Sequence, residues 1–574
     1  MIAFINLVFA IAMALLTKAA PVPRSQVTRR ASGNKIVTAH HMVGNTYPYT
    51  NDTWLRDIRL AHDHGIDAFA LNIGTNDWEP TQVANAYQAA KDSGTNFKLF
   101  ISFDMTVMPC SSPQHATALR DYITRYADHP NQLRYNGNIF ASTFAGDTCT
   151  FGSGSSVDGW KSQFVDQLSG NNKVHLVPAF FSDPNTFKNF DNVIDGVYHW
   201  NSGWPVELTP EKASSLLQPL GGSLTAHLDS PILSNLVGSI QPDKVYLGGL
   251  SNMQNTAKTY MAAVSPWFFT HFGADSFNKN WIYMSNDHLY NKRWETIISN
   301  RNEIDIVQII SWNDYGESHY IGPIEGDQPH SQAWVNGFNH TAWLDMTTYY
   351  ANAFKTGSFP AIDQDKIYLW ARPHPRDATA SSDPLGKPQS YQLMDDAVYA
   401  VVMATSPSKV TLSTSPSSSQ TFDVPAGVTK LTLPISAGGT MYGKVERNGN
   451  TIVELNPDFT FDPNPKTYNY NAMVTFASGN NTQPASPPGK DTPVDNTSSS
   501  TVVSSSLIPD VPVATPSSSS TSDVQPSPAP SPSPSPSPSE GPTSNPTPTP
   551  SPSPTQSNPE RTCMSRRRHR RSYH

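Results

Sequence analysis

Charged side chains are scarce in this chain, and their formal sum is a small negative charge. Only 15% of the 574 residues are charged, and the formal net charge is −8. A nucleic-acid-binding surface needs clustered lysine and arginine side chains, so this composition argues against that class of partner. The length exceeds what one hydrophobic core usually serves, which indicates several regions.

Motifs of several common enzyme classes are missing. No glycine-rich phosphate loop follows a predicted strand, and no Gly-X-Ser-X-Gly sequence is present. These absences count against nucleotide chemistry and serine hydrolysis. His40, His41, His62 and His64 lack a third ligand at a suitable spacing, so the sequence predicts no metal site.

Long apolar runs are missing as well, except at the amino terminus. Residues 2–16 are almost entirely apolar and precede two alanines and a proline, which predicts a secretory signal peptide over residues 1–20. A membrane anchor is the alternative, although the run is short for a full span. The pair Arg29-Arg30 predicts the end of a pro-segment over residues 21–33. We therefore expect a secreted protein, extracellular or associated with a cell wall, without a membrane span.

Cysteine is rare, with three residues in the whole chain. Cys110 and Cys149 each lie in a loop shortly after a predicted strand, and we predict that they form a disulfide, with free buried thiols as the alternative. Cys563 is left over near the carboxyl terminus. Sequons for N-glycosylation, which accord with secretion, occur at Asn51, Asn339, Asn480 and Asn496.

Short apolar runs, each followed by a polar loop and often by an amphipathic stretch, repeat from about residue 34 to residue 311. The eight runs are Lys35–His40, Asp67–Asn72, Lys98–Phe103, Asn138–Phe144, Lys173–Phe181, Asp195–Trp200, Lys258–Val264 and Asp305–Trp312. Helical patterns between them occur at Asp52–His64, Thr81–Ser93 and Gln114–Ala127. Such alternation predicts a parallel sheet covered on both faces, and eight units favour a (β/α)8 barrel over residues 34–360. Two irregularities are the lack of helix between the fifth and sixth runs and an insertion at Gly221–Gln254.

The pattern changes after about residue 361. Alternation of apolar and polar residues, interrupted by turns, occurs at Ala397–Ala404, Lys409–Ser413, Lys430–Ile435 and Met441–Arg447. It predicts a small β-rich, sandwich-like module over residues 361–480, so that the fold class of the ordered chain is α/β followed by β. Residues 481–574 are rich in serine, threonine and proline and end in a basic run, which predicts a disordered, O-glycosylated tail.

Polar residues follow most of the apolar runs. In a β/α barrel the carboxyl ends of the strands meet on one face, and reactive groups lie there. We therefore predict one polar, substrate-binding face at these strand ends. The residues that the runs bring to it are His40, His41, Asn72, Asp104, Asp147, His199, Trp200, Asn313 and Asp314.

The most informative segment follows the last run. It reads Ser-Trp-Asn-Asp-Tyr-Gly-Glu-Ser and places Asp314 and Glu317 three residues apart. Two carboxyl groups with different pKa values can supply the proton donor and the base or nucleophile that cleavage of a glycosidic bond requires. Gly316 is expected to permit an unusual turn that directs both side chains to the mouth of the barrel. The alternative is an acidic loop in which Asp314 caps the next helix and Glu317 is its capping partner.

Asp104 and several tryptophans complete the predicted site. Asp104 closes the third run and is expected to orient water, bind a sugar hydroxyl or tune a catalytic partner, with a structural bond as the alternative. Pyranose C–H faces stack on aromatic rings, so tryptophans near strand ends are candidates for substrate binding, with burial in the core as the alternative. These are Trp200, Trp204, Trp267, Trp281 and Trp312.

Four motifs, in order along the chain, resemble glycoside hydrolase family 71, the fungal α-1,3-glucanases or mutanases. They are His41–Asn45, Gly65–Gly74, Val264–Phe269 and Ser311–Tyr320. The resemblance implies endo hydrolysis of α-1,3-glucan with inversion at the anomeric carbon, without a metal or an organic cofactor. We expect the protein to act as a monomer.

The resemblance also implies roles for individual residues. The Asp-X-X-Glu pair of the family maps onto Asp314 and Glu317, and its further important aspartate maps onto Asp104. Glu317 is expected to be the general acid and Asp314 the general base, while Asn313 and His319 beside the pair are expected to bind substrate. A hydrolase for another linkage, in mannan or another glucan, and a non-catalytic protein that binds wall glucan are the alternatives.

Overall fold

The computed structural model describes residues 35–254, 258–325 and 328–479. The predicted signal peptide (1–20), pro-segment (21–33) and tail (481–574) lie outside these residues, as do Cys563 and the sequons at Asn480 and Asn496. None of the helices in the described part of the chain is both long and apolar enough to cross a bilayer.

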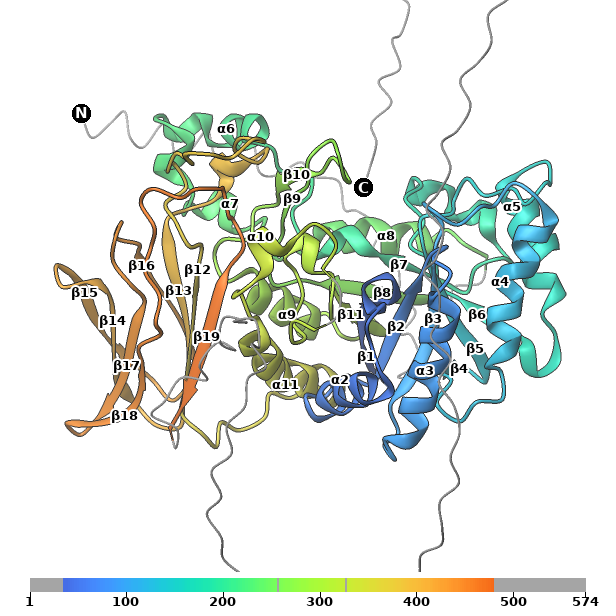
Figure 1. Ribbon diagram of the computed structural model, residues 1–574, viewed down its shortest axis with the longest axis horizontal. Coiled ribbons are helices and arrows are strands. Elements are labelled where there is room, and N and C mark those ends of the chain that lie inside the picture. The colour runs from blue at the N-terminus through green and yellow to red at the C-terminus, as the bar shows by residue number, and fades with distance from the viewer. Residues whose placement is uncertain (1–34, 255–257, 326–327, 480–574) are drawn as a thin grey trace, which may run out of the picture. The chain divides into compact units, whose positions relative to one another are not determined.

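A curled sheet of nine strands organises the amino-terminal part of the protein (Figure 1). Its order is β4-β5-β3-β2-β1-β11-β8-β7, and β6 pairs with β5. Only the short strand β4 is antiparallel to its neighbour. The strands are β1 (Ile36–Met42), β2 (Ala68–Ile73), β3 (Lys98–Asp104), β4 (Arg134–Tyr135), β5 (Asn138–Phe144), β6 (Val174–Leu176), β7 (Gly196–His199), β8 (Thr259–Val264) and β11 (Ile306–Ile309).

Each of the eight predicted apolar runs overlaps one of the parallel strands. The runs are apolar because the sheet is covered on both faces, so that all six residues of β2 are buried. At the ends of the order, the amides of Asp195 and Tyr198 donate to the carbonyls of Leu176 (2.8 Å) and Pro178 (2.9 Å). No ladder joins β6 to β7 within the described residues. The predicted α/β class with a curled parallel sheet is confirmed, whereas closure as a complete (β/α)8 barrel stays a prediction.

Helices pack around this sheet (Figure 1). The three helices expected between the early runs are present, and a capping box of Thr50 and Thr53 begins the first of them. A 3-10 helix at Pro184–Phe190 replaces an α-helix between β6 and β7, and the insertion at Gly221–Gln254 contains two α-helices and a 3-10 helix. The helices are α2 (Asn51–Asp63), α3 (Glu79–Asp92), α4 (Pro113–Arg125), α5 (Ser156–Gly159), α6 (Pro210–Leu217), α7 (Pro231–Ser234), α8 (Gln241–Ser251), α9 (Leu289–Ser299), α10 (Gln332–Val335) and α11 (Thr341–Thr356).

The β-rich module consists of two antiparallel sheets, in the orders β16-β13-β12-β19 and β15-β14-β17-β18. Apolar side chains from both sheets, among them Ile367, Val410 and Val445, form one buried cluster between them. This is the arrangement of a sandwich. The strands are β12 (Lys366–Ala371), β13 (Ala397–Ala404), β14 (Ser408–Ser415), β15 (Ser418–Val424), β16 (Gly427–Pro434), β17 (Tyr442–Arg447), β18 (Asn450–Leu455) and β19 (Met473–Ser478).

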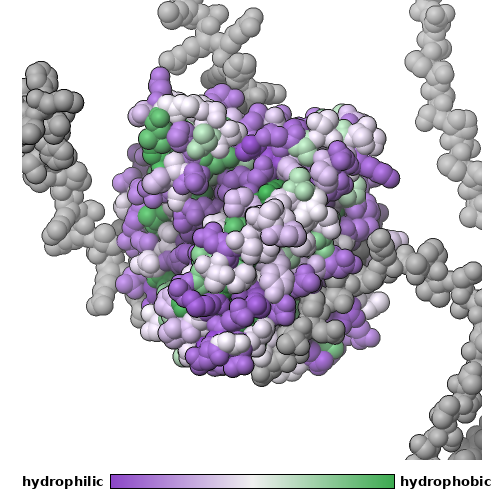
Figure 2. Space-filling view, turned by 90° about the vertical axis from the view of Figure 1, so that its left-hand side faces the viewer, coloured by the Kyte–Doolittle hydropathy of each residue, from purple (hydrophilic) through white to green (hydrophobic). Residues whose placement is uncertain are grey.

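The outer sheet of the module presents mainly polar side chains to the solvent. Strand β14 alternates buried and more exposed residues, and most residues of β15 are exposed or half-buried. The side of the molecule that carries this sheet is largely hydrophilic, with scattered apolar side chains (Figure 2). One face of the outer sheet therefore serves the core of the module, and the other faces water.

The inner sheet of the module shares a core with the first part of the protein. Tyr368 and Trp370 of β12 belong to the same buried cluster as the parallel sheet. The indole of Trp267 donates to the carbonyl of Tyr470 (2.7 Å), and His340 Nε2 lies 2.9 Å from the carbonyl of Ala472. The module is therefore packed against the sheet domain through buried contacts.

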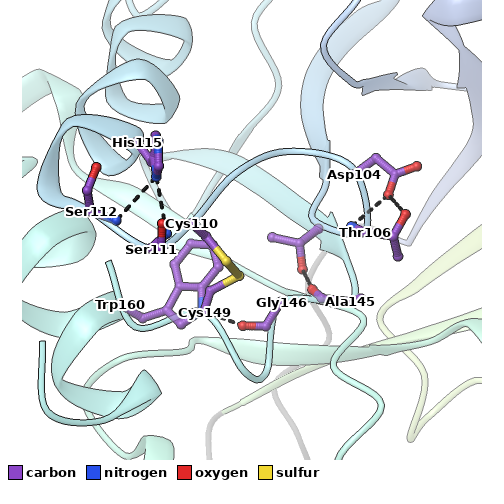
Figure 3. The surroundings of a disulfide bond; sticks show 11 residues. Asp104, Thr106, Cys110, Ser111, Ser112, His115, Ala145, Gly146, Cys149 and Trp160 are labelled. Atoms are coloured by element: carbon purple, nitrogen blue, oxygen red, sulfur yellow. Dashed lines mark hydrogen bonds between the residues drawn. A yellow bond between two sulfur atoms is a disulfide. The ribbon is translucent and has the colours of Figure 1, made fainter. Parts of the chain in front are cut away.

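Cys110 and Cys149 form a disulfide, as predicted (Figure 3). It joins the loop that follows β3 to the loop that follows β5. The indole of Trp160 packs beside it and donates to the carbonyl of Gly146 (2.8 Å). The disulfide thus links the loop that begins at Asp104 covalently to the loop that contains Asp147.

Candidate active site

The loop after β11 is held against the end of β1 by backbone and side-chain hydrogen bonds. The amide of Trp312 donates to the carbonyl of His40 (2.7 Å). The side chain of Asn313 accepts from the amide of Met42 (2.7 Å) and donates to its carbonyl (3.0 Å). The predicted substrate-binding residue Asn313 is fully buried, so it positions the loop.

Asp314 and Glu317 line the same cavity, whose volume is about 120 Å³. Their side chains keep 17% and 16% of their surface exposed, so both carboxyl groups are reachable but largely enclosed. Asp314 is the residue that precedes the short 3-10 helix Tyr315–Glu317, and the lack of a side-chain capping hydrogen bond there counts against an ordinary capping loop. The other lining residues are Met42, Asn45, Phe272, Phe277, Lys279, Tyr315, Gly316, Gln328, Pro329 and Ser331.

Glu317 is paired with two nitrogen groups. Lys279 Nζ lies 3.1 Å from Oε1, and His319 Nε2 lies 3.1 Å from Oε2. Burial alone would raise the pKa of Glu317, but the ammonium of Lys279 and the hydrogen bond and charge of His319 outweigh it and lower the pKa to about 2. Glu317 is therefore ionised over the whole physiological range.

Asp314 has the opposite electrostatic environment. Burial, followed by the negative charge of Glu317, raises its pKa to about 6. Its backbone amide donates to Ser311 Oγ (2.9 Å), whereas the distance from His319 Nε2 to its Oδ2 is 3.8 Å. In a slightly acidic solution Asp314 is protonated while Glu317 is ionised. This polarity favours Asp314 as the proton donor and Glu317 as the base, the reverse of the assignment expected from the sequence.

The two carboxylates lie close together. One oxygen of each, together with a ring nitrogen of His319, lies within 4.8 Å of the others. Carboxyl groups of retaining glycosidases are about 5–5.5 Å apart and those of inverting ones about 6.5–9.5 Å, so this spacing is nearer to the retaining range. The same three donor groups could surround a small cation, but the Lys279 ammonium already supplies a positive charge to Glu317.

Asp104 stands at the end of β3 and accepts hydrogen bonds from the amide (3.0 Å) and hydroxyl of Thr106 (Figure 3). It does not line the cavity of the carboxylate pair. Its charge nevertheless reaches the site, because the pKa of Lys279 is raised first by Glu317 and further by Asp314 and Asp104. The three acids predicted from the sequence thus share Lys279 as a common cation.

Three predicted substrate-binding residues belong to the protein core. His41 is fully buried, stacks on Trp54 at 4.5 Å and lies 3.4 Å from Asp57. The indole of Trp312 donates to the same Asp57 carboxylate (2.9 Å), and that of Trp267 is directed into the β-rich module. These three side chains pack in the core, and none of them lines the cavity of the carboxylate pair.

Other predicted residues lie nearer to the pair. Trp204 is almost fully buried, and its ring centre is 5.6 Å from that of His319. Trp200 is half-buried and lies edge-on to His40 at 4.8 Å. Burial and then the charge of His319 lower the pKa of His40 to about 3, which keeps this ring neutral. The ring of Trp204 therefore packs against His319, and His319 in turn contacts the carboxylate of Glu317.

The remaining predicted residues occupy neighbouring strand ends. Asn72 is buried at the end of β2 and pairs in register with Met42. His199 stacks on Tyr246 at 3.6 Å, and burial lowers the pKa of His199 to about 3. Asp147 lies near the same ring, since its charge contributes to raising the pKa of Tyr246, after burial. None of these three residues lines the cavity of the carboxylate pair.

The sequence did not reveal the role of the hairpin β9 (Phe269–His271) and β10 (Asn280–Ile282). This hairpin supplies Lys279 and two phenylalanines to the cavity. Its strands have three residues each, which is too short for a periodic pattern. The signal that could have drawn attention to it is Lys279 between the aromatic residues Phe277 and Trp281, in the segment that follows the motif ending at Phe269.

Gly316 has a different role from the one expected. Its φ is not positive, and Ser318 (φ 61°) takes the left-handed conformation instead. A Cβ atom at Gly316 would lie 2.6 Å from Cζ of Phe272. The glycine is therefore needed for the close approach of the hairpin to the loop that carries the acids.

Known proteins resemble this chain over most of its length. The sequence model of Glycosyl hydrolase family 71 matches residues 33–486. A glucan endo-1,3-alpha-glucosidase of Schizosaccharomyces pombe is 36% identical over 454 residues, which cover 78% of this chain and 96% of that protein. A mutanase of Penicillium rubens is 31% identical over 479 residues, covering 82% and 95%. An ascus wall endo-1,3-alpha-glucanase of Schizosaccharomyces pombe is 31% identical over 437 residues, covering 73% and 91%.

Proposed function

The chain belongs to glycosyl hydrolase family 71 and is a glycoside hydrolase, and we propose that it cleaves α-1,3-glucosidic bonds within fungal cell-wall α-glucan. The observation that carries this proposal is the pair Asp314 and Glu317, whose carboxyl groups share one cavity and have pKa values displaced in opposite directions. The α-1,3 linkage in this proposal is taken from the names of the relatives.

In the proposed reaction, Asp314 donates its proton to the glycosidic oxygen as the bond to the anomeric carbon breaks. Glu317 is ionised and serves as the base that takes a proton from the attacking water, or as the group that attacks the anomeric carbon itself. Lys279 and His319 hold Glu317 in the ionised form. General acid and base catalysis of this kind contributes roughly 10²–10⁴-fold for each group.

The stereochemical outcome is a separate part of the proposal. The family resemblance implies inversion, which needs a water between the acid and the base. The spacing of Asp314 and Glu317 is short for such a water, and we propose that Asp104, whose charge acts on Lys279 beside the cavity, helps to orient it. Proton NMR of the first anomer released from a soluble α-1,3-oligosaccharide tests the point. Release of the α-anomer would contradict inversion.

We also propose that the curled sheet is a closed (β/α)8 barrel and that the protein is secreted. The two backbone hydrogen bonds between residues 176–178 and 195–198 support closure. The disulfide and the apolar run over residues 2–16 support secretion. Cleavage of the signal peptide can be checked by amino-terminal sequencing of protein from a culture medium.

The test of function is hydrolysis of insoluble α-1,3-glucan beside β-1,3-glucan and mannan. We expect a ladder of oligosaccharides from α-1,3-glucan alone, and about 10²-fold or greater loss of activity in Asp314→Asn and Glu317→Gln. Products from mannan or β-1,3-glucan would assign another linkage. Binding of glucan without product, in the wild type as in the variants, would identify a non-catalytic glucan-binding protein. Glucose as the sole product would contradict internal cleavage.

A further inference from the structure

An aromatic ring stands exposed at the cavity of the catalytic pair. Phe277 keeps 57% of its surface exposed, although it lies in the turn between two strands that are partly or fully buried. It lines the same cavity as Asp314, Glu317 and Lys279. Single exposed apolar side chains are common on protein surfaces, so what distinguishes Phe277 is its place in the cavity of the two acids.

The ring of Phe277 is supported from below. It lies edge-on to Phe272, with centres 4.8 Å apart and planes at 74°. Phe272 is only 7% exposed and packs on Trp334 at 4.9 Å and on Gly316. Backbone hydrogen bonds between Phe272 and Lys279 close the hairpin on either side of Phe277. The ring therefore stands on a closed turn that ends at Lys279, whose ammonium group contacts Glu317.

The hairpin is also attached to the β-rich module. His271 Nε2 lies 2.9 Å from the carboxylate of Asp383, with both side chains nearly buried. The amide of Gln389 donates to the carbonyl of Asn280 (2.9 Å), and the amide of Ile282 donates back to the carbonyl of Gln389 (3.1 Å). These bonds anchor both strands, so the exposure of Phe277 belongs to an ordered element.

We propose that Phe277 is a stacking platform for a glucosyl unit of the substrate, next to the bond that is cleaved. A pyranose presents a face of C–H groups that packs on an aromatic ring, while its hydroxyl groups reach polar residues around it. The ring and the carboxylates share one small cavity, so a sugar on Phe277 adjoins the reacting bond. This inference rests on the proposed glucanase function and adds a binding residue that the tryptophans predicted from the sequence do not provide.

The test compares three substitutions on soluble α-1,3-gluco-oligosaccharides. Phe277→Ala and Phe277→Leu remove the flat ring, and Phe277→Leu retains an apolar side chain against Phe272. We expect KM to rise by about tenfold in both, a typical loss for one stacked aromatic ring, with the pH limits of activity unchanged. Phe277→Tyr keeps the ring and should restore KM to within about twofold of the wild type.

Phe359 provides the matched control. It is 47% exposed, stacks on Tyr349 at 5.3 Å and lies outside the cavity. Phe359→Ala should leave KM unchanged, and thermal unfolding of each variant checks that the fold is intact. A wild-type KM in folded Phe277→Ala, or an equal rise in Phe359→Ala, would overturn the platform while leaving the glucanase function in place. If the wild type itself released nothing from these oligosaccharides, the proposed function would fail.

Discussion

Replacing Lys279 with methionine should move the acidic side of the pH–rate profile to higher pH. Lys279 Nζ lies 3.1 Å from Glu317 Oε1, and both side chains are mostly buried. At an effective dielectric constant of about 20, two unit charges at this distance interact by about 5 kcal/mol. Since one pKa unit corresponds to about 1.4 kcal/mol, even a third of this energy moves a pKa by about one unit.

The direction in which the acidic limit moves follows from the ionisation state that each acid must have. In the proposed mechanism Glu317 acts as an anion, so activity should be lost as the pH falls through its pKa, which is lowered to about 2 in the wild type. Without the ammonium group the anion is less stable, and activity is lost at a higher pH. The alkaline limit should move in the same direction, because Lys279 also lowers the pKa of Asp314.

The assay is kcat/KM for reducing-sugar release, measured from acidic to neutral pH. We expect the acidic limit to rise by at least about one pH unit in Lys279→Met. Lys279→Arg keeps the charge and should keep the limit. Lys244→Met removes a lysine that is paired with Glu303 on the surface (2.6 Å) and serves as the control. An unchanged acidic limit in Lys279→Met would refute the electrostatic account of Glu317.

Three further predictions concern the donor, the disulfide and the close approach of the hairpin. The pKa of Asp314 is about 6, so wild-type kcat/KM should fall as the pH rises through this value, and a rate that keeps rising to neutral pH would place the donor elsewhere. Replacing Cys110 and Cys149 with alanine releases a 39-residue loop and should lower the free energy of unfolding by about 4 kcal/mol, measured with denaturant; an unchanged midpoint would contradict this. Gly316→Ala should lower kcat by at least about tenfold, because the clash at 2.6 Å displaces the loop of the acids, whereas Gly248→Ala has open space and should not. Equal rates in both glycine variants would count against a tight fit at the hairpin.

The strands of the parallel sheet could be predicted because both of their faces are buried. Continuous apolar runs such as Asp67–Asn72 mark such strands without help from distant residues. The acid pair could also be predicted from the sequence, because Asp314 and Glu317 lie close together in the chain and follow the last of these strands. Cys110 and Cys149 were predicted correctly because both follow strands that are neighbours in the sheet.

The electrostatics of the pair could not be predicted from the sequence. Lys279 is 38 residues from Glu317 and reaches it through a hairpin with strands of three residues. The lowered pKa of Glu317 depends on this contact, and it favours an order of acid and base opposite to the one expected from the sequence. Tryptophans posed a similar difficulty, since the burial of Trp267 depends on Tyr470 in the other part of the chain.

The buried contacts between the sheet domain and the β-rich module bear on how family members can exchange parts. The partners of Trp267 and His340 lie at Tyr470 and Ala472, some two hundred and one hundred and thirty residues further along the chain. A crossover near residue 360 would separate these partners and join surfaces that had not diversified together. Recombination within this lineage should therefore preserve both halves as one inherited block.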